Sequence, residues 1–298
     1  MQLKYINMVA IGGGHGLGKV LNTFSELGSN LTGIVATTDN GGSTGKLRNE
    51  TDCIAWGDLR NCIAHLAGSK LGSDLLNYRF KHGDLENHCL GNLIFHALEQ
   101  LEVKPIEIIE IVRRLLRIDS RLYPMSEQPT HLMAESGDKT IIGELAVDNL
   151  RQMPESLSLT EKVYAPNRVI RSIQNANVIL LGPGSFLTSI MPALLVEDIY
   201  HAICLSQAKI IFIDNLGEEH GTCSKTDLNE RLNWLKTIRP NLNIDAVLSS
   251  ESASDIDLSN CLHIKSNLND SDVSYRHNEV KLRQAIYSII SQGVALAS

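Results

Sequence analysis

The stretch that decides the fold is Met8-Val-Ala-Ile-Gly-Gly-Gly-His-Gly-Leu-Gly18. Its apolar start, residues 8–11, is typical of a short buried strand, and glycine follows at once. Helical spacing then connects Leu17, Val20, Leu21, Phe24 and Leu27. A strand, a glycine turn and a helix in this order point backbone N–H groups and the helix dipole at an anion. The stretch predicts a phosphate-binding turn made of Gly12, Gly13, Gly14, His15, Gly16 and Leu17.

This turn has two other interpretations. Glycine turns between a strand and a helix also occur without any ligand. The dinucleotide fingerprint G-x-G-x-x-G is not met, because Leu17 or Lys19 stands where the third glycine belongs. NAD is therefore a less favoured ligand than a phosphorylated nucleotide of another kind.

A second glycine turn follows the next apolar run, Leu31-Thr-Gly-Ile-Val-Ala-Thr37. It consists of Thr38, Asp39, Asn40, Gly41, Gly42 and Ser43. Open α/β sheets bind ligands at the carboxyl ends of their strands, so turns after consecutive strands should face one crevice. The P-loop spacing G-x-x-x-x-G-K-[ST] is not met, because Asn40 and Leu47 occupy the glycine and hydroxyl positions.

Asp39 is the candidate for catalytic chemistry. A carboxylate after the second strand often binds a ribose hydroxyl, and it could equally hold a divalent ion such as Mg²⁺ beside phosphates. The alternative is an Asp that only caps a helix or a turn.

A third glycine turn ends the apolar run 178–181. Its candidate binding residues are Gly182, Pro183, Gly184, Ser185 and Ser189. The nucleophile motif G-x-S-x-G is not met around Ser185, which argues against a serine hydrolase. A turn that only packs a helix on a strand is again the alternative.

Polar residues between these turns add further candidates. Asp58 can cap a helix whose first turn carries Arg60 and Asn61, which could reach a ligand or face solvent. His88 and Asn92 lie four residues apart and would share one helical face. For His88, a cap or a satisfied, partly buried histidine is the alternative.

The segments around these residues predict the rest of the architecture. Helical patterns over about 58–118 predict a helical insertion after the second strand. Short runs at 122–127, 131–135 and 140–143 predict a small antiparallel sheet within about 120–165, with 161–164 as a further strand. We expect one α/β domain over residues 1–298.

Composition excludes several classes of protein. The net charge of the 298 residues is −7 and no long basic run occurs, which argues against binding to nucleic acid or to an anionic membrane. Six cysteines without a C-x-x-C pair argue against a zinc site and a disulfide framework. Glycine and proline interrupt the apolar run 178–196, so we expect no membrane span. The first strand begins near residue 8, so we expect no signal peptide and a cytoplasmic location.

Together and in this order, the motifs resemble the YvcK/CofD-like family, most closely its proteobacterial gluconeogenesis-factor branch. The matching stretches are 12–18, 38–45, 57–61, 90–93, 124–127, 182–185 and 215–217. The resemblance implies a Rossmann-like three-layer αβα core and a nucleotide ligand. UDP-sugars are bound in the YvcK branch, where the protein is linked to gluconeogenic growth and cell shape. Related transferases use a guanosine-linked donor and a divalent metal.

Three positions depart from the family pattern. His15 stands where the wider family more often has Thr, and Asn87 where it usually has Gly; Asn tolerates the left-handed region. Asn40 replaces the second member of an Asp-Asp pair, which leaves one carboxylate for a metal.

These observations lead to an ordered set of expectations. First is a nucleotide-sugar-binding protein, with UDP-N-acetylglucosamine as a candidate ligand. Second is a metal-dependent transferase that moves a phosphorylated group from a nucleotide donor, with Asp39 as metal ligand or base and His15 or His88 positioning the acceptor. Third is an NAD-dependent protein. Protein partners are left open, including a homodimer.

Overall fold

A parallel seven-stranded sheet forms the centre of the molecule, with strands in the order β10-β9-β8-β7-β1-β2-β3. The computed structural model describes residues 5–216, 226–258, 260–270, 272–273 and 276–295. The strands of this sheet are β1 (Met8–Gly12), β2 (Leu31–Val35), β3 (Arg121–Pro124), β7 (Val178–Leu181), β8 (Lys209–Ile213), β9 (Ala246–Ser249) and β10 (Leu262–Lys265). The predicted α/β class is confirmed.

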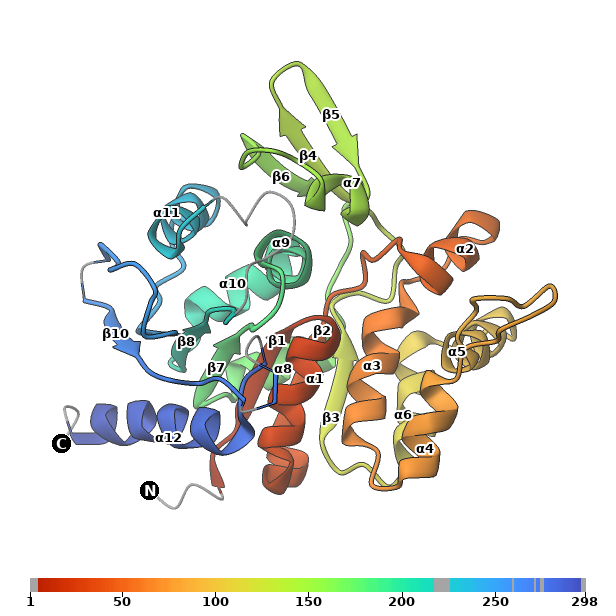
Figure 1. Ribbon diagram of the computed structural model, residues 1–298, viewed down its shortest axis with the longest axis horizontal. Coiled ribbons are helices and arrows are strands. Elements are labelled where there is room, and N and C mark those ends of the chain that lie inside the picture. Colours follow the sequence, from red (N-terminus) through yellow and green to blue (C-terminus); the bar gives the residue numbers. More distant parts are fainter. Residues whose placement is uncertain (1–4, 217–225, 259, 271, 274–275, 296–298) are drawn as a thin grey trace.

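Helices cover both faces of the sheet (Figure 1). One face is covered mainly by α1 (Gly14–Thr23), α3 (Trp56–Leu66), α5 (Leu90–Gln100), α6 (Pro105–Leu115) and α12 (Glu279–Ala295). The other is covered by α8 (Asn167–Gln174), α9 (Met191–Leu195), α10 (Glu197–Leu205) and α11 (Leu228–Ile238). Shorter elements are η2 (Ser25–Asn30), α2 (Gly42–Glu50), α4 (Lys70–Asn77) and η3 (Phe186–Ile190).

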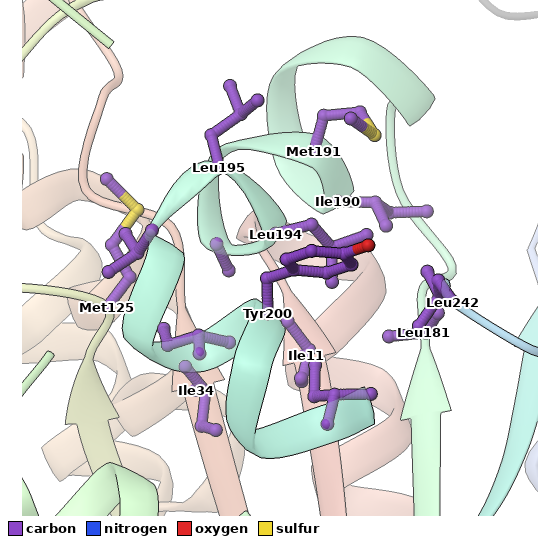
Figure 2. Close-up of a cluster of buried hydrophobic side chains, with 14 of the residues drawn as sticks. Ile11, Ile34, Met125, Leu181, Ile190, Met191, Leu194, Leu195, Tyr200 and Leu242 are labelled. Atoms are coloured by element: carbon purple, nitrogen blue, oxygen red, sulfur yellow. The ribbon is translucent and has the colours of Figure 1, made fainter. Parts of the chain in front are cut away.

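The alternation of side chains along the strands explains why both faces need cover. In β1, Val9 and Ile11 belong to one buried cluster, whereas Met8 and Ala10 belong to the other. Figure 2 shows the first cluster, in which Ile11 lies beneath residues of α9 and α10. A strand buried on both faces appears as a continuous apolar run, which is the pattern that identified β1, β2 and β7 in the sequence.

The chain reverses its direction of travel across the sheet at β1. From β1 the chain adds β2 and β3 on one side, and it later adds β7 to β10 on the other. In open α/β sheets such a switch point leaves a crevice outside the carboxyl ends of the two central strands. The crevice is therefore expected beyond Gly12 and Leu181.

A three-stranded antiparallel sheet stands apart from the large sheet (Figure 1). It contains β4 (Leu132–Ser136), β5 (Lys139–Ile142) and β6 (Ser156–Leu159), with the short helix α7 (Glu144–Asp148) between β5 and β6. The run 122–127 was expected in this small sheet, but its residues 122–124 belong to β3, which pairs with β2 in the large one. Residues 161–164, expected as a further strand, form none; β6 takes the pairing position beside β4 instead.

Two helix predictions also differ from the structure. Residues 42–50 form α2, so Gly42 and Ser43 of the expected second glycine turn are the first two residues of a helix. The helix α5 begins at Leu90, so His88 precedes it and does not share a helical face with Asn92. Within the described residues no single helix has the length and apolarity to span a bilayer; only the pair 186–195 and 197–205, bent by 82°, meets those two criteria jointly.

Candidate functional site

The three glycine turns follow three adjacent strands, β7, β1 and β2. The first and third turns are in direct contact. A methyl group at Gly16 would lie 2.5 Å from the carbonyl oxygen of Pro183, and one at Gly13 would lie 3.3 Å from Cβ of Ser189. The backbones of the two turns approach so closely that only glycine fits between them.

The first turn begins α1 without a side-chain cap. Gly13 is the N-cap residue and Gly14 follows with φ +57°, in the left-handed region that favours glycine. The carboxyl group of Asp58 accepts a hydrogen bond from the backbone N–H of Gly14. The expected helix cap at Asp58 is wrong: α3 has Ala55 as its N-cap, and Asp58 in its first turn faces α1 instead.

The third turn is fixed by Asn215, which follows β8. Its side chain accepts a hydrogen bond from Gly184 N–H at 3.0 Å and donates one to Gly184 O at 2.9 Å. The hydroxyl of Ser185 donates to Asp148 of α7, at 3.4 Å. Asn215 and Leu216 of the matching stretch 215–217 are described, whereas Gly217 lies outside the described residues.

The second turn is tied to α7. Asp39 Oδ1 accepts the N–H of Gly41 at 2.7 Å, which is the turn role considered for it. Asn40 Oδ1 accepts the N–H of Leu145 at 3.0 Å, so this departure from an Asp-Asp pair anchors the small sheet. Thr38 donates to Glu144 at 3.5 Å. The guanidinium of Arg48 donates to the carbonyls of Thr38 and Asp39.

Four carboxyl groups interact electrostatically around these turns: Asp39, Asp58, Glu144 and Asp148. Burial, reinforced by the charge of Asp39, raises the pKa of Asp58 to about 7. Burial also raises the pKa of Glu144 well above its ordinary value, and the neighbouring Asp58, Asp39 and Asp148 raise it further. Of these four acids, the sequence predicted only Asp39 as a site residue. In the sequence, Asp58, Glu144 and Asp148 resemble ordinary acids at helix ends.

This cluster has the donor chemistry of a divalent-cation site. Its side chains offer hard carboxylate oxygens, which suit Mg²⁺, and the raised pKa values of Asp58 and Glu144 mark a place where positive charge would be stabilising. Among the described residues, the group of three potential metal ligands whose ligand atoms lie within 4.8 Å of one another is found elsewhere in the fold. It consists of Cys53, His96 and Glu99. No three carboxyl groups of the acidic cluster therefore have ligand atoms that all lie within that distance of one another.

Four of the sequence candidates lie in a neighbouring network that is buried except for the half-buried His88. Asn92 accepts from Nε of Arg60 at 3.3 Å, and its amide donates to Thr44 at 3.3 Å. Arg60 also donates to Asn77. Its side chain is therefore buried and does not face solvent. Ser43 accepts the N–H of Cys89 at 3.0 Å and lies 3.5 Å from Nδ1 of His88. Asn61 is also buried, and its Oδ1 has no donor within the described part of the chain.

A cavity of about 660 Å³ lies where the first and third turns meet. Its wall contains His15, whose Nδ1 is 3.2 Å from Nε2 of His65. Burial lowers the pKa of both histidines, and nearby cations lower each further. Lys19, Arg276 and Glu279 also line it, and the ammonium group of Lys19 forms an ion pair with Asp270 at 3.4 Å. Sequence motifs did not single out Lys19, His65 or Arg276, which lie outside the glycine runs.

Comparisons with known proteins show the family and the fold of this chain. A family profile described as 2-phospho-L-lactate transferase CofD matches residues 8–294. The chain belongs to the CofD family. The chain is similar to two proteins named "Putative gluconeogenesis factor", among others. The protein of Pasteurella multocida is 44% identical, over 97% of this chain and 95% of its own length. The protein of Yersinia pestis is 43% identical, over 96% of this chain and 94% of its own length.

A solved structure shows the same fold. A protein described as a member of the UPF0052 family, from Bacillus halodurans, superposes with a TM-score of 0.88 at 26% identity and covers 95% of this chain and 99% of its own. The family resemblance and the Rossmann-like core expected from the sequence are therefore confirmed.

Proposed function

We propose that this CofD-family protein binds a nucleotide sugar in the crevice beyond β7, β1 and β2, with UDP-N-acetylglucosamine as the first candidate. One observation carries the proposal: the first and third glycine turns touch each other, and the second follows the adjacent strand. Backbone N–H groups of such turns bind phosphate oxygens. The cavity beside them falls in the size range of small-molecule sites.

The residues divide into two groups by the part of the ligand they would serve. Gly13–Leu17, together with Gly184 and Ser189, would surround the phosphates, and Lys19 would add a positive charge beside them. Asp39 would bind a ribose or sugar hydroxyl, as its place after β2 suggests. Gluconeogenic growth and cell shape are the processes in which such a protein would act.

Calorimetry of the full chain tests the proposal. UDP-N-acetylglucosamine, UDP-glucose, GDP and NAD are titrated separately, and we expect the UDP-sugars to bind. Lys19→Ala should weaken that binding about tenfold, which corresponds to about 1.4 kcal/mol. Lys236→Ala is the control. It removes the same charge from an exposed position on α11 that does not line the cavity, and it should leave binding unchanged. Absence of heat with every nucleotide would refute the proposal.

A second function, transfer of a phosphorylated group from a nucleotide donor, is favoured by the acidic cluster. Asp39, Asp58 and Glu144 would hold a divalent cation, which neutralises developing charge on phosphate oxygens. Asp39 would act as metal ligand or base, and His15, which lines the cavity, would position an acceptor. His88 lies instead beside Ser43, in the buried network.

The two functions differ in the behaviour of one variant. Asp39→Asn should keep nucleotide binding and lose the metal-dependent release of a nucleoside monophosphate if a phosphorylated group is transferred from a nucleoside-diphosphate donor. If the protein only binds, no product forms with either protein and any metal effect is confined to affinity. Product analysis by mass spectrometry after incubation with Mg²⁺ distinguishes the two outcomes.

A further inference from the structure

A second cleft, of about 590 Å³, opens at the opposite end of the large sheet. Its floor includes Val9 of β1, Thr32 of β2 and Tyr123 of β3. Its walls are α6 on one side and α8 on the other. It begins at the first residues of the strands, whereas the glycine turns follow the last ones. Strands advance about 3.3 Å per residue, so the two places are separated by roughly the length of β1.

Arginine dominates this second cleft. Four arginines line it: Arg113 from α6, Arg121 from β3, and Arg168 and Arg171 from α8. The acidic residue among the lining residues is Glu110, which pairs with Arg113 at 3.0 Å and lies 3.9 Å from Arg168. One carboxylate therefore faces four guanidinium groups, in a chain whose net charge is −7. Such an excess creates a strong local positive potential.

Several donors of these arginines lack an internal partner. The side chains of Arg121 and Arg171 make no hydrogen bond or ion pair to any other described residue. The Nε–H of Arg113 is buried without an acceptor in the same described set. The guanidinium groups of Arg121 and Arg171 are exposed and line the cleft, so their donors are available to a ligand that supplies acceptors.

One arginine is held rigidly in place. The Nη1 group of Arg113 donates to the carbonyls of Ile118, at 2.6 Å, and Asp119, at 3.1 Å, which belong to the loop that leads into β3. Its Nη2 group donates to Glu110. Because Arg113 is fixed by these bonds, the cleft has one guanidinium positioned before any ligand binds.

We propose that this cleft is a second binding site, for a small polyanion that carries at least two phosphate or carboxylate groups. Guanidinium groups bind both kinds of oxyanion through paired N–H donors. The hydroxyls of Thr32 and Ser172 and the ring of Tyr123 offer contacts to a carbon skeleton between the anionic groups. This site is separate from the nucleotide crevice and does not depend on its function.

Calorimetry with two probes tests the site: inorganic pyrophosphate for phosphate chemistry and citrate for carboxylate chemistry. The test variant is Arg121→Ala/Arg171→Ala, which removes two exposed side chains and should fold normally. The matched control, Arg151→Ala/Lys236→Ala, removes the same charge from two exposed positions outside the cleft. Melting temperatures of both variants verify that they are folded.

We expect the test variant to bind at least one probe tenfold or more weakly than the unaltered chain, while the control retains the affinity. The probe that is lost identifies the ligand as phosphorylated or carboxylic. Pyrophosphate bound at the glycine turns would persist in the test variant as a distinct class of sites, so it does not obscure the loss. Identical isotherms for the test variant and the unaltered chain, or no binding of either probe at millimolar concentration, would overturn the proposal.

Discussion

Asp58 accepts a hydrogen bond from the backbone N–H of Gly14, so a carboxyl group lies against the very turn that was expected to bind a phosphate. Burial raises the pKa of this carboxyl group to about 7. A phosphate can still use the other N–H groups of the turn, but it would then lie near an acid. Either a proton on Asp58 or a cation beside it removes the repulsion.

The pH dependence of stability should report the proton on Asp58. Between about pH 4 and pH 7 the unfolded chain has released this proton while the folded chain keeps it, so stability falls as pH rises. A difference of one between the pKa values of the folded and unfolded chains corresponds to about 1.4 kcal/mol. Asp58→Asn should therefore melt at a higher temperature than the unaltered chain at pH 8, and the difference should vanish near pH 4.

The control for this measurement is Asp74→Asn, which changes an exposed acid of α4. Its melting temperature should follow that of the unaltered chain at every pH. An Asp58→Asn protein that is less stable at pH 8 would show that the charged carboxylate, and not the protonated group, stabilises the turn.

Magnesium should stabilise the folded protein at pH 8. An ion bound by the acidic cluster offsets the repulsion among Asp39, Asp58 and Glu144, and at ten times its dissociation constant it adds about 1.4 kcal/mol. Differential scanning fluorimetry should show a rise of a few degrees. Asp39→Asn and Glu144→Gln should reduce the rise and Asp74→Asn should not. An equal rise in all four proteins would place the ion elsewhere.

Gly16→Ala should disrupt the contact between the first and third turns. The added methyl group would lie 2.5 Å from the carbonyl oxygen of Pro183, a backbone atom that cannot rotate away. Overpacking of this kind costs about 1–3 kcal/mol of unfolding free energy. Gly68→Ala is the matched control, because its methyl group meets no atom within 4 Å. Urea unfolding of both variants measures the difference; similar midpoints would contradict the close approach.

Arg48→Ala should loosen the second turn. Its guanidinium donates hydrogen bonds to the carbonyl groups of Thr38 and Asp39 and to that of Thr130, which precedes β4. Loss of these bonds should cost about 2 kcal/mol in urea unfolding. Lysine offers a single ammonium group instead of a planar guanidinium. The unfolding free energy of Arg48→Lys should therefore lie between those of Arg48→Ala and the unaltered chain. Arg151→Ala, on the exposed surface, should match the unaltered chain. Full stability of Arg48→Ala would mean that the turn holds its shape without these bonds.

The sequence identified features that local patterns encode. Buried strands and glycine turns are contiguous, so β1, β2 and β7 and the turns after them were recognisable. The helix α2 was missed because Gly42–Glu50 is mostly polar and has Leu47 as its one large apolar residue. Its stability comes from contacts such as those of Ser43 and Thr44 with α5 and the residue before it, which no local pattern reveals.

The acidic cluster could not be recognised because its members are far apart in the sequence. Asp58 and Glu144 meet only when α3 and the small sheet pack around the second turn. Arg60 was assigned to solvent or ligand because its partners, Asn77 and Asn92, come from two later helices. Charge interactions of this kind depend on tertiary packing and leave no periodic signal.

The helix α7 brings Glu144 and Asp148 to the crevice from the small antiparallel sheet, whereas the glycine turns all belong to the large sheet. Glu144 and Asp148 and the backbone N–H groups of the glycine turns therefore come from different segments of the chain. Replacement of the lobe between β3 and β7 alone would give a descendant protein with the same glycine turns and different acidic residues beside them. Evolution within this architecture can therefore alter the acids of the proposed metal site without rebuilding the turns of the proposed nucleotide site.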